Sequence, residues 1–144
     1  MKSSEKRENI PETIVRRLQP GEDLKQSIQE LIESSRLSAG VIVSLVGSLR
    51  RAGLRFADAK EARIVDGPFE IVAATGTLGC GKMHIHLCLA DGQGRVVGGH
   101  IMEGCEINTT AEIVILNLSS NFAFERTLDA STGYAELMPR KNEA

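Results

Sequence analysis

The sequence predicts an α+β subunit in which one amphipathic helix packs on a largely antiparallel β-sheet or half-barrel of about seven strands. Three observations support this fold class. One segment near the N-terminus repeats its apolar residues with the helical period, and the later segments are short, rich in β-branched residues and bounded by turn residues. The length of 144 residues is that of one ordinary domain, and no long linker divides it.

A strand is expected at residues 13–18, and the helix follows it after a Pro-Gly turn. Glu22 and Asp23 are expected in the first turn of the helix, where negative charge suits the helix dipole. The polar stretch 33–36 should end the helix. Its apolar residues recur at spacings of four, three and one, which places them on one face. These residues are Leu24, Ile28, Leu31 and Ile32.

The remaining elements are expected to be short strands joined by tight turns. Asp91-Gly92-Gln93-Gly94 is typical of a hairpin, so the strands on either side of it should pair. Residues 1–12 and 139–144 are expected to be loose tails on either side of one domain at 13–138. The predicted strands after the helix are residues 39–46, 49–57, 69–78, 84–90, 95–102, 112–118 and 122–128.

The charge balance disfavours nucleic-acid binding by this domain alone. Lysine and arginine number 17 against 19 aspartate and glutamate, whereas a protein that neutralises many phosphates usually has a basic surplus. Aromatic residues make up 3% of the chain, so few rings could stack on bases. Two basic pairs, Arg16-Arg17 and Arg50-Arg51, fall in strands, where neighbours point to opposite faces. We interpret them as solvated surface or as contacts between subunits.

The cysteines and the N-terminus favour a cytoplasmic protein with no membrane partner. Cys80, Cys88 and Cys105 form no CxxC pair and are expected to be reduced, buried thiols. The N-terminal segment lacks the apolar stretch of a signal peptide, and no apolar run approaches the ~20 residues that span a bilayer.

All three histidines lie between positions 84 and 100. His84 and His86 are two residues apart on a predicted strand and therefore share a face, and the hairpin should return His100 to their neighbourhood. Three imidazoles suit a divalent metal, zinc first, with a fourth position for water, a carboxylate or a ligand. The alternatives are ordinary polar histidines, or imidazoles that act as acid, base or hydrogen-bond partner.

Three further residues are candidates for ligand binding around the histidines. Gly98 and Gly99 lie inside a predicted strand, which indicates either a bulge or a close approach to the backbone. Glu112 precedes an apolar run and could orient a histidine or supply a fourth ligand, or it could be an exposed charge at the start of a strand. The stretch 79–82 looks like part of a phosphate loop but lacks the required spacing, so we exclude nucleotide binding there.

A series of short motifs runs in order from about Thr13 to about Leu137. The motifs are Arg16 with Pro20-Gly21-Glu22-Asp23-Leu24, Gly47-Ser48-Leu49, Gly67-Pro68-Phe69-Glu70-Ile71, Thr75-Gly76-Thr77-Leu78, His84-Ile85-His86-Leu87, Gly98-Gly99-His100-Ile101 and Thr110-Ala111-Glu112. In this order they resemble the PPC domain, the plants and prokaryotes conserved family. The resemblance implies a homotrimer of α+β subunits with a histidine pocket close to the subunit boundaries. In some prokaryotic relatives that pocket looks metal-bound, and His84, His86, His100 and Glu112 match the motifs concerned.

Three functions remain open at this point. The first is a trimeric binding protein whose histidine pocket takes a metal ion or a small ligand. The second is a DNA-binding regulator, which is a frequent label for the family, but plant members carry a basic R-G-R-P segment for the minor groove that does not occur here. The third is a metal-dependent enzyme of unknown substrate, for which the sequence offers no nucleophile and no cofactor loop. We predict the first.

Overall fold

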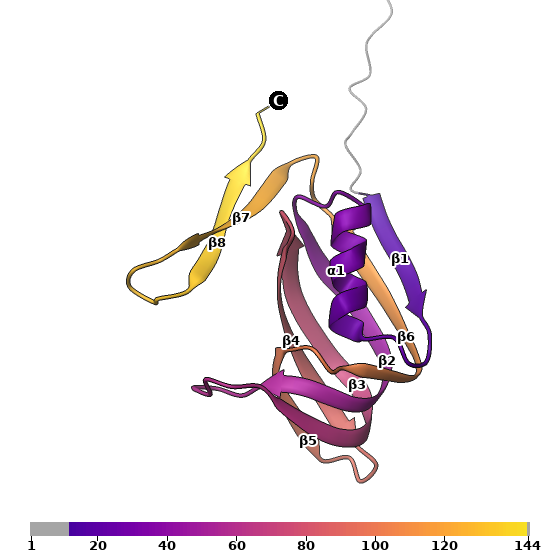
Figure 1. Ribbon diagram of the computed structural model, residues 1–144. Coiled ribbons are helices and arrows are strands. Elements are labelled where there is room, and N and C mark those ends of the chain that lie inside the picture. Colours follow the sequence, from indigo (N-terminus) through magenta and orange to yellow (C-terminus); the bar gives the residue numbers. More distant parts are fainter. Residues whose placement is uncertain (1–11, 144) are drawn as a thin grey trace, which may run out of the picture.

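The computed structural model describes residues 12–143 and shows a mostly antiparallel sheet with one helix (Figure 1). The predicted α+β class is therefore correct, and the N-terminal tail expected at 1–12 lies outside the described residues except for Glu12. The elements in chain order are β1 (Glu12–Leu18), α1 (Leu24–Ser34), β2 (Gly40–Arg55), β3 (Arg63–Gly79), β4 (Lys82–Asp91), β5 (Val96–Ile101), β6 (Glu106–Asn117), β7 (Phe122–Leu128) and β8 (Ala135–Lys141).

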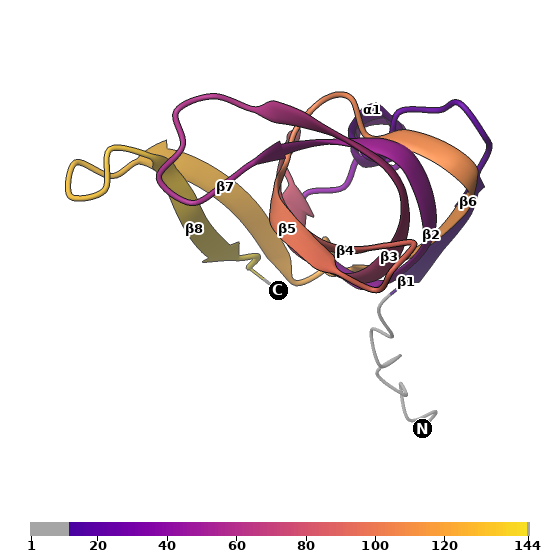
Figure 2. The same ribbon diagram turned by 90° about the horizontal axis from the view of Figure 1, so that it is seen from below.

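The main sheet has six strands in the order β1-β6-β2-β3-β4-β5, and it closes on itself at one end. Closure occurs because β2 is long enough to pair with β6 and β3 and then, at its end, with β5. There Leu54 lies opposite Ile101 and Arg55 lies opposite His100. Strands β2 to β5 therefore form a closed ring, the barrel, which Figure 2 shows end-on.

Three strands are longer than predicted. The expected strands 39–46 and 49–57 are one strand, β2, because Gly47 and Ser48 continue the pairing with β3 instead of turning. Strand β3 begins at Arg63 and not at the expected residue 69, so the Asp66-Gly67-Pro68 segment also lies within a strand. Strand β6 begins at Glu106 and not at Glu112.

Helix α1 begins at Leu24, so neither Glu22 nor Asp23 lies in its first turn as expected. Asp23 is the N-cap, and its Oδ1 accepts a 3.0 Å hydrogen bond from the Gln26 N–H. Its Oδ2 accepts a second bond, of 2.8 Å, from Gly104 N–H in the β5–β6 connection. Asp23 therefore caps the helix and also attaches it to the barrel, which the charge-dipole argument did not anticipate. The apolar face is buried as predicted, through Leu24, Ile28, Leu31 and Ile32.

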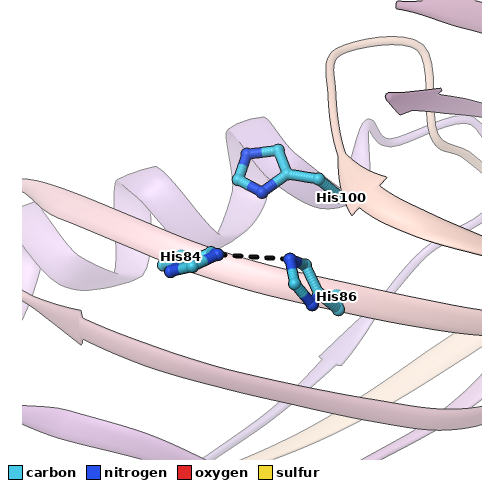
Figure 3. Close-up of side chains that lie close together, drawn as sticks. All are labelled: His84, His86 and His100. Carbon is cyan, nitrogen blue, oxygen red and sulfur yellow. Dashed lines mark hydrogen bonds between the residues drawn. The ribbon is translucent and has the colours of Figure 1, made fainter. Parts of the chain in front are cut away.

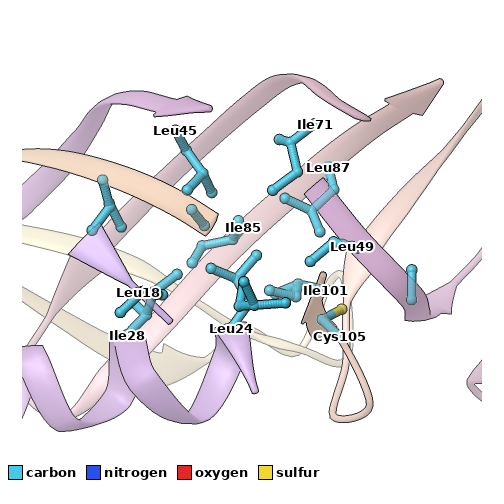
Figure 4. Close-up of a cluster of buried hydrophobic side chains, with 14 of the residues drawn as sticks. Leu18, Leu24, Ile28, Leu45, Leu49, Ile71, Ile85, Leu87, Ile101 and Cys105 are labelled. Atoms are coloured by element: carbon cyan, nitrogen blue, oxygen red, sulfur yellow. The ribbon is translucent and has the colours of Figure 1, made fainter. Parts of the chain in front are cut away.

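The core fills the space between α1 and the ring of strands (Figure 4). In β4, Ile85, Leu87 and Leu89 are at most 3% exposed and pack into this core. Because side chains alternate along a strand, His84 and His86 must point to the outer face of the barrel. The side chains that fix the core thus also fix the direction of the histidines.

Strands β7 and β8 form a separate two-stranded sheet beside the barrel (Figure 1). Strand β8 was not predicted, and the C-terminal tail expected from residue 139 begins inside it, since β8 extends to Lys141. The Arg126 Nη2 atom donates a 2.8 Å hydrogen bond to Thr77 Oγ1 and connects β7 to β3. Leu128, Tyr134 and Met138 of the hairpin are more than half exposed.

Within residues 12–143, no helix has the length and apolar character needed to cross a bilayer.

Candidate metal centre

The three histidines lie together on the outer face of the barrel (Figure 3). His86 on β4 is directly opposite His100 on β5, and His84 lies two residues before His86 on the same face. The ring centroids are 4.9 Å apart for His84 and His86, 5.3 Å for His84 and His100, and 5.6 Å for His86 and His100. One ring nitrogen from each residue lies within 4.8 Å of the others.

Two hairpin turns set this register. Cys80 and Gly81 form a two-residue turn between β3 and β4, and both have positive φ values, 50° and 73°. This is the conformation of the type I′ hairpin turn. This turn fixes the register of β3 and β4, so Thr77 lies opposite His84 and Thr75 lies opposite His86. The Asp91–Arg95 turn, held by the 2.9 Å bond from Asp91 N–H to the Arg95 carbonyl, pairs His86 with His100.

The closed ring extends this pairing into a row of four residues. The row runs from Thr75 on β3 through His86 and His100 to Arg55 at the end of β2. Residues directly opposite each other in antiparallel strands have their side chains on the same face. The barrel closure therefore places a guanidinium in line with the imidazoles.

The nitrogen positions are compatible with a zinc-type ion. Zn–N bonds of about 2.0–2.1 Å at tetrahedral angles place ligand nitrogens about 3.3 Å apart. The Nε2 atoms of His84 and His86 are separated by 3.2 Å, which meets this requirement. The His100 nitrogen lies within 4.8 Å of both and would have to move closer to complete the set. The residues present therefore fit a three-imidazole metal centre.

Two of the imidazoles are held in the neutral form that binds metals. Burial, followed by the charges of His86 and Arg126, lowers the pKa of His84. Burial, followed by the charge of Arg55, lowers the pKa of His100 to about 4. A neutral imidazole has a lone pair free for a metal, whereas a protonated one does not. At neutral pH both residues can therefore act as ligands without first losing a proton.

Three cavities meet at the histidines, and His84 lines all of them. The first, of about 400 Å³, is bounded by all three histidines together with Arg55, Gly98 and Gly99. The second, of about 360 Å³, lies between the barrel and the β7–β8 hairpin. The third, of about 310 Å³, extends over β2 and β3 beside His84 and His86.

Gly98 and Gly99 are required by close backbone approach and not by a bulge. The pairing of β4 with β5 runs through both residues without a register shift. A Cβ atom on Gly98 would lie 2.7 Å from the Leu87 carbonyl oxygen, and one on Gly99 would lie 2.9 Å from the Arg55 carbonyl oxygen. The approaching groups are neighbouring strands, so the glycines allow the ring of strands to close beside the site.

Glu112 does not join the cluster. It is exposed on β6, paired with Arg17 on one side and Val46 on the other, and β2 and β3 separate β6 from β4. Within this subunit Glu112 is an exposed residue in the interior of β6 and not at the start of a strand. Two carboxylates line cavities with the histidines: Asp58 borders the cavity under all three, and Glu136 of β8 borders the cavity beside His84 and His100.

Sequence reasoning missed Thr77, Arg55, Arg126 and Glu136. The two-residue turn at Cys80-Gly81 carried the signal for Thr77, because recognising the turn type fixes which residues lie opposite the histidines. Arg55 depends on the pairing of β2 with β5, and Arg126 and Glu136 depend on the position of the separate hairpin. Neither arrangement leaves a local pattern in the sequence.

The basic pair Arg50-Arg51 also differs from expectation. Both side chains reach the same carboxylate, since Arg50 Nη1 and Arg51 Nε each lie 3.2 Å from an oxygen of Glu106. The strand alternation fails here because the pairing of β2 shifts register between Leu49 and Arg51. The pair is therefore partly neutralised within the subunit.

The cysteines are only partly buried. Cys105 is buried and Cys88 half-buried, as their small apolar side chains suggested, but Cys80 is exposed. Cys80 occupies the β3–β4 turn with a φ of 50°, and that turn projects it out of the core.

Comparison with known sequences identifies the domain and two longer relatives. The family model described as the Plants and Prokaryotes Conserved (PCC) domain matches residues 5–119. The bifunctional protein GlmU of Synechococcus sp. strain JA-3-3Ab is 46% identical over 121 residues, which cover 84% of this chain and 19% of GlmU. GlmU from strain JA-2-3B'a(2-13) is 45% identical over 121 residues, which again cover 84% of this chain and 19% of GlmU. The chain thus spans about a fifth of the length of these relatives.

Comparison with solved structures gives the same fold. A hypothetical protein from Salmonella enterica is 32% identical with a TM-score of 0.88, covering 92% of this chain and 96% of that one. A metal-containing protein from Archaeoglobus fulgidus is 29% identical with a TM-score of 0.74, covering 90% and 95%. A candidate DNA-binding protein from Bacteroides thetaiotaomicron is 16% identical with a TM-score of 0.78, covering 90% and 98%, and shows the fold alone. The chain belongs to the Plants and Prokaryotes Conserved domain family.

Proposed function

We propose that this protein binds a divalent metal ion, zinc first, through His84, His86 and His100. The observation that carries the proposal is the convergence of three ring nitrogens within 4.8 Å on the outer face of the barrel. Three imidazoles form a donor set typical of zinc, with a fourth position open to an oxygen ligand. The metal-containing relative from Archaeoglobus fulgidus, 29% identical, supports the proposal.

The site resembles a binding centre that admits a ligand more than a closed structural site. Structural zinc sites use four protein ligands, whereas three ligands leave a position for an exchangeable group. His84 and His86 are exposed, and cavities of about 400 and 360 Å³ adjoin them. A bound ion would polarise a small molecule in the open position, and the protein would provide the walls around that molecule.

Metal analysis of the purified protein tests this function. We expect close to one zinc ion per wild-type chain, supplied during purification or by dialysis against zinc, and loss of that ion in a His84→Ala/His86→Ala double variant. Gln93→Ala, at the tip of the same β4–β5 hairpin, is the matched control and should keep the metal. Equal metal content in the wild type and the double variant would overturn the proposal, as would a wild type that takes up no zinc.

We further propose that the protein works as a homotrimer. Apolar side chains on β1 and β2 support this assembly, since Val15 is 70% exposed, Val43 61% and Val46 51%. Exposed apolar groups concentrated on one sheet mark a surface that another subunit can cover. Light scattering should report three times the 15.6 kDa subunit mass at micromolar concentration. A stable monomer would contradict this part of the proposal.

A further inference from the structure

We infer that Arg55 and Arg126 form an anion subsite beside the metal position, and that the molecule bound there is a small carboxylate or phosphate compound. This inference rests on the proposed metal site and names the class of ligand that would occupy its open position. Each arginine belongs to an element that sequence reasoning did not connect with the histidines.

Arg55 is placed by the closure of the barrel. It is the last residue of β2 and lies directly opposite His100, so the two side chains share the outer face. Arg55 lines the cavity under all three histidines and also the cavity beside the hairpin.

Arg126 approaches the same place from the hairpin. Its Nη2 atom donates a 2.8 Å hydrogen bond to Thr77 Oγ1, and Thr77 is directly opposite His84. This bond fixes the guanidinium at the wall of the cavity that His84 and His100 also line. A guanidinium carries five N–H donors, so one hydrogen bond leaves several for a ligand.

The charges around this cavity call for an anion once a metal is present. Within residues 12–143, no carboxylate oxygen lies within 4.0 Å of a side-chain nitrogen of Arg55 or Arg126. Glu136 is the acidic residue of the cavity, and its Oε1 already accepts a 2.9 Å bond from Thr132 Oγ1. Asp58 lines the neighbouring cavity under the histidines. A divalent ion beside two guanidiniums therefore adds positive charge that these two carboxylates do not fully offset.

The shape and chemistry of the cavity indicate a small organic anion. A guanidinium can donate two parallel hydrogen bonds to the paired oxygens of a carboxylate or a phosphate, whereas the ammonium group of a lysine acts as a single point charge. The volume of about 360 Å³ is near the lower end for small-molecule pockets and therefore suits a small organic ligand. Met83, Tyr134 and Ala135 form the rest of the wall and offer apolar contact to a short carbon skeleton.

This arrangement requires that metal and anion strengthen each other's binding. An anion held by the two arginines lowers the repulsion that a divalent ion meets, and the ion in turn attracts the anion. Coupling between two bound ligands is reciprocal, so each should raise the affinity of the other by the same factor. We expect a factor of about ten or more, which is the usual size of such coupling.

Cobalt(II) titrations followed by visible absorption measure this coupling. The wild type is titrated in chloride, in acetate and in methyl phosphate at equal ionic strength, so that the two anion arms separate carboxylate from phosphate chemistry. We expect tighter cobalt binding and an altered spectrum in at least one anion. Arg55→Gln and Arg126→Gln should bind cobalt in chloride with unchanged stoichiometry but lose most of the enhancement. Arg140→Gln, which removes an arginine of the same hairpin that is paired with Glu125 at 2.7 Å, should behave as wild type.

The outcomes separate this inference from the proposed function. The anion subsite would be overturned if cobalt bound to the wild type with no effect of the anion. It would also be overturned if both glutamine variants showed the same anion effect as the wild type. Either result would leave the metal site intact. If no cobalt binds, the metal site fails, and calorimetry of the metal-free protein with each anion decides the subsite by whether binding depends on the arginines. Arg55→Lys and Arg126→Lys guard against misfolding, since they keep the charge and should retain part of the enhancement.

Discussion

The Arg126 Nη2 atom donates a 2.8 Å hydrogen bond to Thr77 Oγ1 and attaches the β7–β8 hairpin to β3, in addition to the 2.8 Å bond from Phe124 N–H to the Ser38 carbonyl. Replacing Thr77 by Val keeps the shape of the side chain and removes the acceptor. Because the donor is a charged group, loss of this hydrogen bond should weaken the attachment of the hairpin by about 1.5–3 kcal/mol. Contact of the arginine with water reduces this cost. Amide exchange of the hairpin should therefore accelerate in Thr77→Val.

Thr75→Val is the matched control for this change. Thr75 lies two residues away on the same strand and pairs with His86, so the substitution alters the same face of β3 without touching Arg126. Exchange in the hairpin should stay at the wild-type rate in this variant. Similar acceleration in both variants would show that the Arg126–Thr77 bond does not hold the hairpin.

The stability of the metal-free protein should depend on pH through His100. Its pKa is lowered from 6.5 to about 4, mainly by burial and then by Arg55, His84, His86 and Lys25. Between these two values the unfolded chain carries the proton and the folded chain does not, so acid favours unfolding. The free energy of unfolding should therefore decrease as the pH falls from about 6.5 to about 4.

Urea unfolding at several pH values, with chelator present, measures this dependence. His100→Gln removes the titrating ring and should give a flatter profile over the same interval. The effect should be modest, since the imidazole of His100 retains contact with water. A wild-type profile that matches the variant across this interval would contradict the prediction.

The end of β2 should tolerate no side chain at Gly53. A Cβ atom there would lie 1.8 Å from the Glu103 carbonyl oxygen, and the Gly53 carbonyl accepts a 2.9 Å bond from Met102 N–H. Gly53→Ala must therefore push β2 away from the β5–β6 connection, at a cost of about 1–3 kcal/mol or more. Thermal unfolding should show a clearly lower midpoint.

Gly92→Ala is the control for Gly53→Ala. A Cβ atom on Gly92 would meet nothing within 4 Å, so the change should stay within about 0.5 kcal/mol. If both variants unfolded at the wild-type temperature, the close contact at Gly53 would not be a feature of the protein in solution.

Duplex DNA should not bind to this domain at physiological salt. The chain has a net charge of −2, and one of its exposed basic pairs, Arg50 and Arg51, shares the carboxylate of Glu106. Proteins that neutralise several phosphates lose affinity steeply as salt rises. Fluorescence anisotropy with AT-rich and mixed duplexes should stay flat, whereas binding that weakens steeply with salt would restore the DNA-binding interpretation.

The cysteines should differ in their reactivity with thiol reagents. Cys80 is exposed in the β3–β4 turn, whereas burial raises the pKa of the Cys105 thiol to about 11. The reactive species is the thiolate, so Cys105 should stay unmodified until the protein unfolds. An Ellman assay should show one fast thiol that disappears in Cys80→Ser. Rapid labelling of Cys105 in the folded protein would contradict its burial.

Local patterns in the sequence predicted the parts of the fold that depend on near neighbours. The four-three-one spacing of Leu24, Ile28, Leu31 and Ile32 located α1, and the Asp91–Gly94 turn located the β4–β5 hairpin. Two-residue alternation correctly placed His84 and His86 on one face. These predictions succeeded because periodicity and turn chemistry act over a few residues.

The predictions that failed concern contacts between segments that are distant in the sequence. Gly47 and Ser48 suggested a break, but pairing with β3 continues through them and makes one long β2. Arg55 reaches the histidines only because β2 also pairs with β5, and Arg126 only because the hairpin lies against β3. A single sequence carries no local record of such pairings, so the positions of Arg55 and Arg126 beside the histidines could not be predicted.

The family match ends at residue 119, and the hairpin that brings Arg126 and Glu136 to the cavity begins at Phe122. The strands that would hold the ion therefore lie within the segment that the family model matches, and one wall of the adjoining cavity comes from a hairpin that follows this segment. Changes in the hairpin would leave the imidazoles in place, so the ligand-facing wall and the metal position can be altered separately.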